Sequence, residues 1–191
     1  MNDLAGTPAN PYVGPRAFTR HDTLFGRDVE KVNLLNIVIS ERVVLLYSPS
    51  GAGKTSLIQA GVIPALEAEK FRPMPIIRVN HAPSGNGDGT ASNRYVASAL
   101  HSLAEATPGI PDLGSDDLSG ISMSEYLDRL DRGWRSSSDA ASDPVVLIFD
   151  QFEEILTVDP ADLAVKDAFF AQVGEALRAR HRWALFSMRE E

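Results

Sequence analysis

Residues 42–55 read RVVLLYSPSGAGKT, and this stretch decides the fold. Its first part, RVVLLY (42–47), is short, apolar and rich in β-branched residues, which predicts a buried strand. Its second part, SPSGAGKT (48–55), is rich in glycine and leads into apolar residues that predict a helix. A strand that passes through a glycine-rich turn into a helix is typical of α/β proteins in which the turn holds a phosphate group.

The octet 48–55 fits the Walker A pattern G-x-x-x-x-G-K-[ST], except that Ser48 stands where the pattern has its first glycine. Gly51 and Gly53 let successive N–H groups curl into an anion nest. Lys54 can reach the β- and γ-phosphates, and the Thr55 hydroxyl suits Mg²⁺. The alternative is a plain glycine-rich turn with a solvated lysine; Ser48 fits the phosphate loop if its φ is negative. We expect these residues to contact the nucleotide: Ser48, Pro49, Ser50, Gly51, Ala52, Gly53, Lys54, Thr55 and Ser56.

Asp150 stands at the exit of a second predicted buried strand, PVVLIF (144–149). An acid after an apolar strand is the Walker B arrangement, in which the aspartate holds Mg²⁺, usually through water. Glu153 and Glu154 follow, and one of these carboxylates could orient and deprotonate an attacking water. Two consecutive glutamates cannot share one direction, so we expect one to be the base and the other a helper or a surface charge. A solvated helix start is the alternative for this pair.

Two further strands are predicted at 74–79 (MPIIRV) and 183–188 (WALFSM). Arg189 follows the second of them. If that strand lies beside the strand before the phosphate loop, Arg189 would lie near the γ-phosphate, because ligands in open α/β sheets bind outside the carboxyl ends of the strands. An ordinary surface arginine is the alternative.

Helical spacing of apolar residues predicts helices at 28–39, from Tyr95 to Leu103, and after a capping box formed by Ser122 and Glu125. Gly61 and Pro64 are expected to end the helix that follows the phosphate loop. Asp159 and Pro160 are expected to be the N-cap and first residue of the last helix. Strands that alternate with helices predict an α/β domain with a parallel sheet covered on both faces.

The composition excludes several classes of protein. With 43% hydrophobic residues the 191-residue chain is globular and of one-domain size. Lys plus Arg is 18 against 26 Asp plus Glu, and a net charge of −8 argues against direct binding of nucleic acid or of an anionic membrane. The absence of cysteine excludes disulfides and thiolate sites. Without a signal peptide or an apolar run of about 18 residues, we expect a cytoplasmic protein with no membrane contact.

We divide the chain into an extended, proline-punctuated leader at 1–23 and a core at 24–191. The chain ends three residues after the last predicted strand, so we expect it to be a fragment of a longer protein.

The sequence resembles the nucleotide-binding domain of STAND NTPases, the signal-transduction ATPases with numerous domains, in particular a bacterial branch with DQFEE at Walker B and related to NACHT and AP-ATPase domains. Five segments carry this resemblance in family order: NPYVGPRAF (10–18), LFGRD (24–28), LLYSPSGAGKTSLIQAGVIPAL (45–66), VVLIFDQFEEILT (145–157) and ALFSMRE (184–190).

The resemblance implies a P-loop three-layer sandwich with strand order 5-1-4-3-2, of which the fifth strand is expected to be missing here. It matches Gly26 and Arg27 to a motif beside the bound nucleotide and Asp150 to the Mg²⁺ aspartate. It also matches Glu153 and Glu154 to the acidic pair, and Arg189 to the arginine of the sensor strand. The implied cofactors are ATP or ADP and Mg²⁺.

The implied function is an ATP-gated switch that self-associates when a sensor domain finds its target, in defence or regulated cell death. We expect the family's lid, winged helix, sensor and effector parts to lie outside this sequence. Three functions stay open. The first is a switch that binds Mg–ATP and hydrolyses it slowly. The second is a non-catalytic scaffold that holds ADP or ATP and oligomerises. The third is a small-molecule kinase, for which Arg178, Arg180 and Arg182 would have to form a lid, although they stand directly before a strand.

Overall fold

A computed structural model describes residues 16–80, 93–105, 118, 120–137, 143–159 and 161–190. Residues 1–15 of the predicted leader therefore lie outside the described residues, and the division at residue 24 stays a prediction. The elements are α1 (Asp28–Ser40), β1 (Val43–Ser48), α2 (Lys54–Ser56), the π-helical turn η1 (Leu57–Val62), α3 (Ile63–Ala68), β2 (Arg72–Ile77), α4 (Arg94–Glu105), α5 (Met123–Ser137), β3 (Val145–Phe149), α6 (Glu154–Thr157), α7 (Leu163–Ala176) and β4 (Arg182–Arg189).

The four strands form one parallel sheet in the order β1-β4-β3-β2. This confirms the predicted α/β class and the 1-4-3-2 part of the expected order. All five residues of β3 are buried, which explains why this strand reads as an unbroken apolar run. The order puts β4 directly beside β1, so the ends of β1, β3 and β4 meet at one edge of the sheet.

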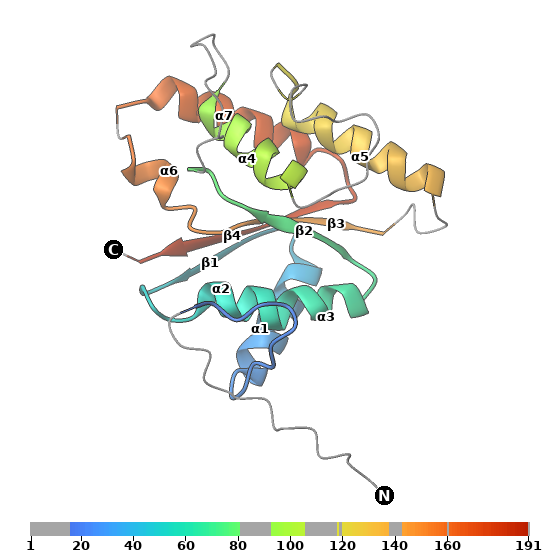
Figure 1. Ribbon diagram of the computed structural model, residues 1–191, viewed down its shortest axis with the longest axis vertical. Coiled ribbons are helices and arrows are strands. Elements are labelled where there is room, and N and C mark those ends of the chain that lie inside the picture. The colour runs from blue at the N-terminus through green and yellow to red at the C-terminus, as the bar shows by residue number, and fades with distance from the viewer. Residues whose placement is uncertain are drawn as a thin grey trace, which may run out of the picture.

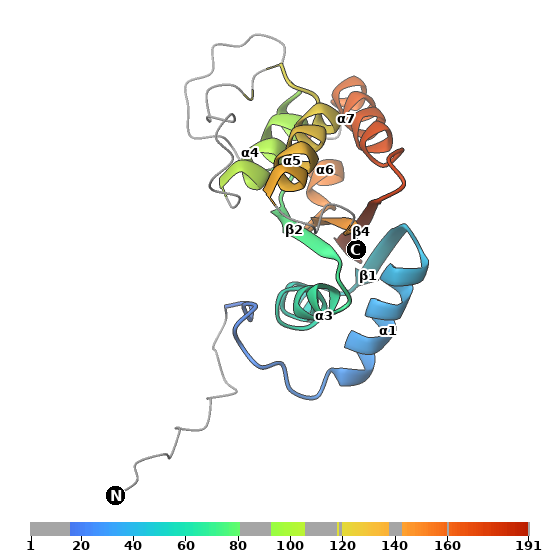
Figure 2. The same cartoon turned by 90° about the vertical axis from the view of Figure 1, so that its right-hand side faces the viewer.

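Helices cover both faces of the sheet (Figures 1 and 2). Helices α1 and α3 lie on one face, while α4, α5 and α7 lie on the other. The alternating side chains of β3 divide the core accordingly: Val146 and Ile148 pack with the first group, and Leu147 and Phe149 with the second. Within the described residues, no helix combines the length and the apolar character needed to cross a membrane.

The expectation of a sheet covered on both faces fails at β1. This edge strand exposes every second side chain, Val43 at 58%, Leu45 at 58% and Tyr47 at 54%, on the face that looks away from α1. The resemblance places a fifth strand beside β1, and that expectation stays a prediction. At the opposite edge, β2 begins at Arg72, two residues before the predicted start. Pro73 and Pro75 are accommodated there because an edge strand has one side without pairing partners.

The expected helix end at Gly61 and Pro64 is wrong, because the helical run continues to Ala68. Gly61 is buried, and an added Cβ would lie 3.4 Å from Cγ of Lys31, so this glycine provides a close packing surface. Pro64 stands at the start of α3, directly after the π-helical turn. In that turn Ile63 N–H bonds to the Ile58 carbonyl oxygen, so the backbone is already widened where Pro64, which has no N–H to donate, enters the run.

The predicted start of the last helix is also wrong. Helix α7 begins at Leu163, and Asp162 occupies its cap position without a side-chain cap bond. Asp159 and Asp162 instead bind Arg94 at the start of α4, at 3.1 and 3.0 Å. Pro160 lies outside the described residues. A long-range arginine has thus taken the Asp159 carboxylate that was expected to cap this helix, together with that of Asp162.

The capping box is half confirmed. Ser122 Oγ accepts the N–H of Glu125 at 3.2 Å. The Glu125 carboxylate does not reach back to Ser122, because it pairs with Arg129 one turn further along α5 at 2.7 Å.

Candidate functional site

The phosphate loop connects β1 to α2 at the carboxyl edge of the sheet. Gly51 and Gly53 have φ of 76° and 77°, a left-handed conformation that explains why glycine stands at both positions. Ser48 is the last residue of β1, and it is absent from the described non-glycine residues with positive φ. Serine can therefore replace the first glycine of the pattern, because the φ of Ser48 is not positive.

Lys54 begins α2 and folds back over the loop. Its ammonium group donates to the carbonyl oxygens of Ser48 at 2.8 Å and Pro49 at 3.0 Å. The ammonium group therefore lies along the loop itself, where a bound phosphate would meet a positive charge as well as the backbone N–H groups.

The two predicted metal ligands are in direct contact. Thr55 Oγ1 donates to Asp150 Oδ2 at 2.8 Å, although 95 residues separate them in the chain. Asp150 is 1% exposed. A hydroxyl and a carboxylate are the hard oxygen ligands that Mg²⁺ takes from proteins, with water and phosphate completing its shell. Among the described residues no group of three or more His, Cys, Asp or Glu could hold a metal, so a cage built only of protein ligands is not formed there.

The acidic pair lies on the next turn of chain. Glu153 directly precedes α6 and Glu154 begins it. Glu153 Oε2 accepts the backbone N–H of Arg189 at 3.1 Å, so this carboxylate is tied to the end of β4. Both glutamates are half-buried and both line the cavity described below. The geometry distinguishes a tethered carboxylate, Glu153, from its neighbour Glu154.

Arg189 lies where the sequence predicted it, at the end of β4 and paired in register with Ser48. Its side chain is exposed and lines the same cavity.

Gly26 and Arg27 lie behind the loop. Gly26 has φ of 71°, and Arg27 Nη1 donates to the carbonyl oxygen of Ala52 at 3.0 Å. Ser56 Oγ accepts the N–H of Phe18 at 3.1 Å. Gly26 and Arg27 do not line the cavity, so their described contacts support the phosphate loop from outside.

A cavity of about 640 Å³ joins these groups, which is within the usual size range of ligand pockets. Its lining contains Arg16, Ala17, Ser50, Gly51, Gly53, Lys54, Thr55, Ser56, Asn80, Asp150, Gln151, Glu153, Glu154, Thr157, Val158 and Arg189. The predicted loop, metal and acidic residues therefore meet at one place, apart from Ser48, Pro49 and Ala52, which do not line the cavity.

Sequence reasoning missed several residues of this cavity. Arg16 comes from the predicted leader, where it forms an ion pair with Asp22 at 2.8 Å. That bond, with donors from Thr19, holds the pKa of the Asp22 carboxyl well below its usual range. Arg78, which is not a lining residue, was also missed: it follows β2, and its Nη1 donates to Oε1 of the lining residue Gln151 at 2.8 Å. The strand predicted at 74–79 contained Arg78, whereas the structure places it just past the strand, at the carboxyl edge of the sheet.

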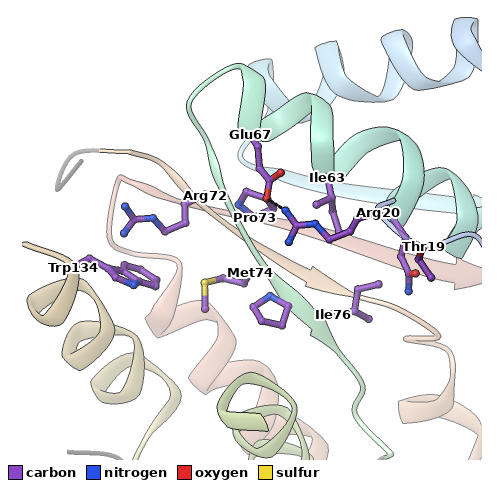
Figure 3. A pocket seen from close by; sticks show the side chains of 11 residues that line it. Thr19, Arg20, Ile63, Glu67, Arg72, Pro73, Met74, Ile76 and Trp134 are labelled. Carbon is purple, nitrogen blue, oxygen red and sulfur yellow. Dashed lines mark hydrogen bonds and ion pairs between the residues drawn. The ribbon is translucent and has the colours of Figure 1, made fainter. Parts of the chain in front are cut away.

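A second cavity, of about 510 Å³, lies at the β2 edge of the sheet (Figure 3). Its rim carries the Arg20–Glu67 ion pair at 2.6 Å, and Arg72 lies over the Trp134 ring at 4.2 Å. Met74 and Ile76 contribute apolar side chains from β2. None of the predicted site residues lines it, so the chemistry gathers in the first cavity.

The helix-end arginines do not form a lid. Arg182 is 1% exposed and is the first residue of β4, at the opposite end of the strand from Arg189. Arg178 pairs with Glu175 on its own helix end at 2.9 Å. Neither side chain lines the phosphate-loop cavity.

Comparisons with known proteins agree with the fold. The Walker-type ATPase of Pyrococcus abyssi superposes with a TM-score of 0.59 at 15% identity, over 92% of this chain and 48% of that one. The ORC2 protein of Aeropyrum pernix, solved in ADPNP–ADP complexes, gives a TM-score of 0.55 at 16% identity, over 93% and 44%. The chain thus spans about half the length of these structures, and at such identities they show the fold alone.

A search of curated proteins found no match. A family model described as "Novel STAND NTPase 1" matches residues 11–191, nearly the whole chain. The chain belongs to this family of STAND-class P-loop NTPases.

Proposed function

We propose that this chain is the nucleotide-binding core of an ATP-driven switch, which binds Mg–ATP in the phosphate-loop cavity and hydrolyses it slowly. The observation that carries the proposal is the Thr55–Asp150 contact, because it joins the hydroxyl of one nucleotide motif to the carboxylate of the other. Family membership supports the same function. In the longer protein we expect the switch to self-associate under the control of further domains, in the cytoplasm, in bacterial defence or regulated signalling.

Each predicted residue has a role in this proposal. The N–H groups of residues 50–55 and the Lys54 ammonium group would hold the β- and γ-phosphates. Thr55 and Asp150 would hold Mg²⁺, which neutralises charge on the phosphates. The exposed guanidinium of Arg189 would meet the γ-phosphate from the neighbouring strand. Arg27 would keep the loop in shape through its bond to Ala52, and Gly26, with φ of 71°, would allow the turn that places Arg27 there.

We assign the water-activating role to Glu154 and the helper role to Glu153. Glu153 already accepts an N–H bond from Arg189, so its Oε2 is engaged and the carboxylate is tied to the end of β4. Glu154 begins α6, lines the cavity and makes no side-chain hydrogen bond within the described residues. Its lone pairs are therefore available to a water molecule.

Glu154→Gln and Glu153→Gln test this function against the scaffold alternative. We expect Glu154→Gln to lower ATP turnover by about 100-fold or more with unchanged ADP affinity, which is the usual scale of losing a general base. Glu153→Gln should cost less, since an amide oxygen still accepts the Arg189 N–H. Absence of turnover in the wild-type chain and in a longer form of the protein would favour a scaffold that only holds nucleotide.

A further inference from the structure

Arg78 lies beside the proposed metal ligands without being one of them. It directly follows β2, the strand next to β3 in the sheet. Its Nη1 donates to Gln151 Oε1 at 2.8 Å, and its Nη2 lies 3.8 Å from Asp150 Oδ2. One guanidinium thus faces two consecutive residues of the acidic motif.

The contact with Asp150 is loose for an arginine and a carboxylate. Asp150 is 1% exposed, and among the described residues the only donor at Oδ2 within hydrogen-bond distance is the Thr55 hydroxyl at 2.8 Å. A buried carboxylate needs a compensating positive charge, and well-formed Arg–carboxylate bonds are about 2.7–2.9 Å long. At 3.8 Å the guanidinium supplies that charge without a direct bond. The pairing is therefore weak enough to be exchanged.

The backbone of Arg78 is fixed while its side chain is partly exposed. Its carbonyl oxygen accepts the Ser98 hydroxyl at 2.7 Å, and its N–H donates to Ser102 Oγ at 3.3 Å, both from α4. The guanidinium can therefore change partners without moving the strand end.

Gln151 gives the guanidinium a second anchor. Gln151 is one of two non-glycine residues with positive φ in the described part of the chain, and its φ is 56°. The backbone turns at this residue between two hydrogen bonds. Asp150 N–H donates to Ile77 of β2 at 3.1 Å, and Phe152 N–H donates to Ser187 of β4 at 2.9 Å. Strained conformations of this kind persist where neighbouring groups hold them, and the Arg78 bond to the Gln151 side chain does so.

We propose that Arg78 is a positioning residue that balances the charge of Asp150 while no metal is bound, and that Mg²⁺ competes with it for Asp150. The inference rests on the proposed function, because it needs Mg²⁺ to bind with nucleotide at Thr55 and Asp150. Thr55 and Arg78 approach the same carboxylate oxygen, Oδ2. A dication held there is repelled by a guanidinium 3.8 Å from that oxygen, and this repulsion raises the Mg²⁺ concentration that the site requires.

The test measures ADP affinity by calorimetry as MgCl₂ is varied, in the wild-type chain, Arg78→Gln and Arg78→Lys. Arg78→Gln keeps an amide near Gln151 but loses the charge, so the Mg²⁺ concentration at half effect should fall by roughly five- to tenfold. Arg78→Lys keeps the charge and should stay within about twofold of wild type. Arg178→Gln, at a 79% exposed arginine on the far side of the domain, is the matched control and should change nothing.

A second readout is the melting temperature, measured first without nucleotide and then with it. In EDTA, Arg78→Gln should melt at a lower temperature than wild type, because Asp150 stays buried without its charge partner, and Mg²⁺ with ADP should raise its melting temperature by more than it raises that of wild type. An unchanged or increased Mg²⁺ requirement in Arg78→Gln overturns the inference and leaves the proposed function standing. Failure of the wild-type chain to bind ADP at any Mg²⁺ concentration overturns both, and the wild-type titration alone shows which case holds.

Discussion

The two ends of the sheet use arginine and aspartate in different ways. At the amino end, Arg182 is 1% exposed, and its Nη2 donates to Asp128 at 2.5 Å and to Asp131 at 2.6 Å. At the carboxyl end, Asp150 is equally buried, but Arg78 stays 3.8 Å away and one hydroxyl supplies its hydrogen bond. The first cluster is closed by short bonds, whereas the second leaves its charges able to take new partners.

The neighbours of each cluster continue this difference. At the amino end, Arg42 donates to the carbonyl oxygens of Leu177, Ala179 and Arg182 and so caps the end of α7. At the carboxyl end, Lys54 rests on two carbonyl oxygens of its own loop, and Glu154 points into the cavity with no described bond. Charges paired by short bonds stabilise a fold, while loosely paired charges at the carboxyl edge of a parallel sheet suit a ligand site.

The largest effect on stability is expected from Arg182→Met. Removing the guanidinium leaves Asp131, whose side chain is 12% exposed, with His181 as its described partner at 2.8 Å. We expect the free energy of unfolding to fall by about 3–5 kcal/mol, the usual cost of breaking a buried pair from one side. Urea denaturation measures this change. A loss below about 1 kcal/mol would contradict the structural role of the amino-end cluster.

Asp150→Asn should change stability little and remove the effect of Mg²⁺, in contrast to Arg182→Met. The amide has the same shape and still accepts the Thr55 hydroxyl, so in EDTA the free energy of unfolding should change by less than about 1 kcal/mol. The effect of Mg²⁺ on ADP affinity should disappear, because the charged ligand is gone. If instead this variant unfolds like Arg182→Met while keeping its Mg²⁺ dependence, the two ends do not differ as described.

Much of the fold could be predicted from sequence because it depends on local patterns. The continuous apolar runs identified all four strands, and Gly51 and Gly53 marked the left-handed turns. The predicted helix ends were wrong for two reasons. Arg94, distant in the chain, takes the carboxylate that was expected to cap α7. A π-helical turn, which simple spacing does not predict, continues the helix through Gly61.

The candidate site was predictable in part for the same reason. Its loop, its aspartate and its glutamates stand in recognisable motifs, whereas Arg78, Arg16 and the strain at Gln151 belong to no local pattern. Their roles follow from strand order, which the sequence indicated only through resemblance to a family.

A smaller effect separates two positions of the loop. Gly51→Ala puts a Cβ on a residue with φ of 76°, and we expect it to cost roughly 1–2 kcal/mol of stability, although no atom would clash. Ser48→Gly lies in strand geometry and should change stability by less than about 1 kcal/mol and ADP affinity only slightly. Thermal melts of both variants compare them. Equal losses would mean that Ser48 is as constrained as the glycines.

The smallest effect concerns pH and the segment around Arg16. Because Arg16 and Thr19 hold the pKa of Asp22 below its ordinary value of 3.8, the ionised carboxylate favours the folded state. That contribution is fully present above pH 3.8 and is lost as the pH falls through the lowered pKa. Melting curves of wild type and Asp22→Asn should therefore differ by a constant amount near neutral pH and converge in acid. A gap that persists or widens in acid would contradict this linkage.

The most direct test of a nucleotide site at the carboxyl edge is calorimetric titration of the wild-type chain and Lys54→Ala with ADP and Mg²⁺. Arg178→Ala serves as the exposed control. We expect wild type and the control to bind ADP. Lys54→Ala should lose about 100-fold or more in affinity, because removing a charged partner of a bound phosphate costs several kcal/mol. Its melting temperature without ligand should be unchanged. Equal affinity of Lys54→Ala and wild type would contradict a nucleotide site at this edge.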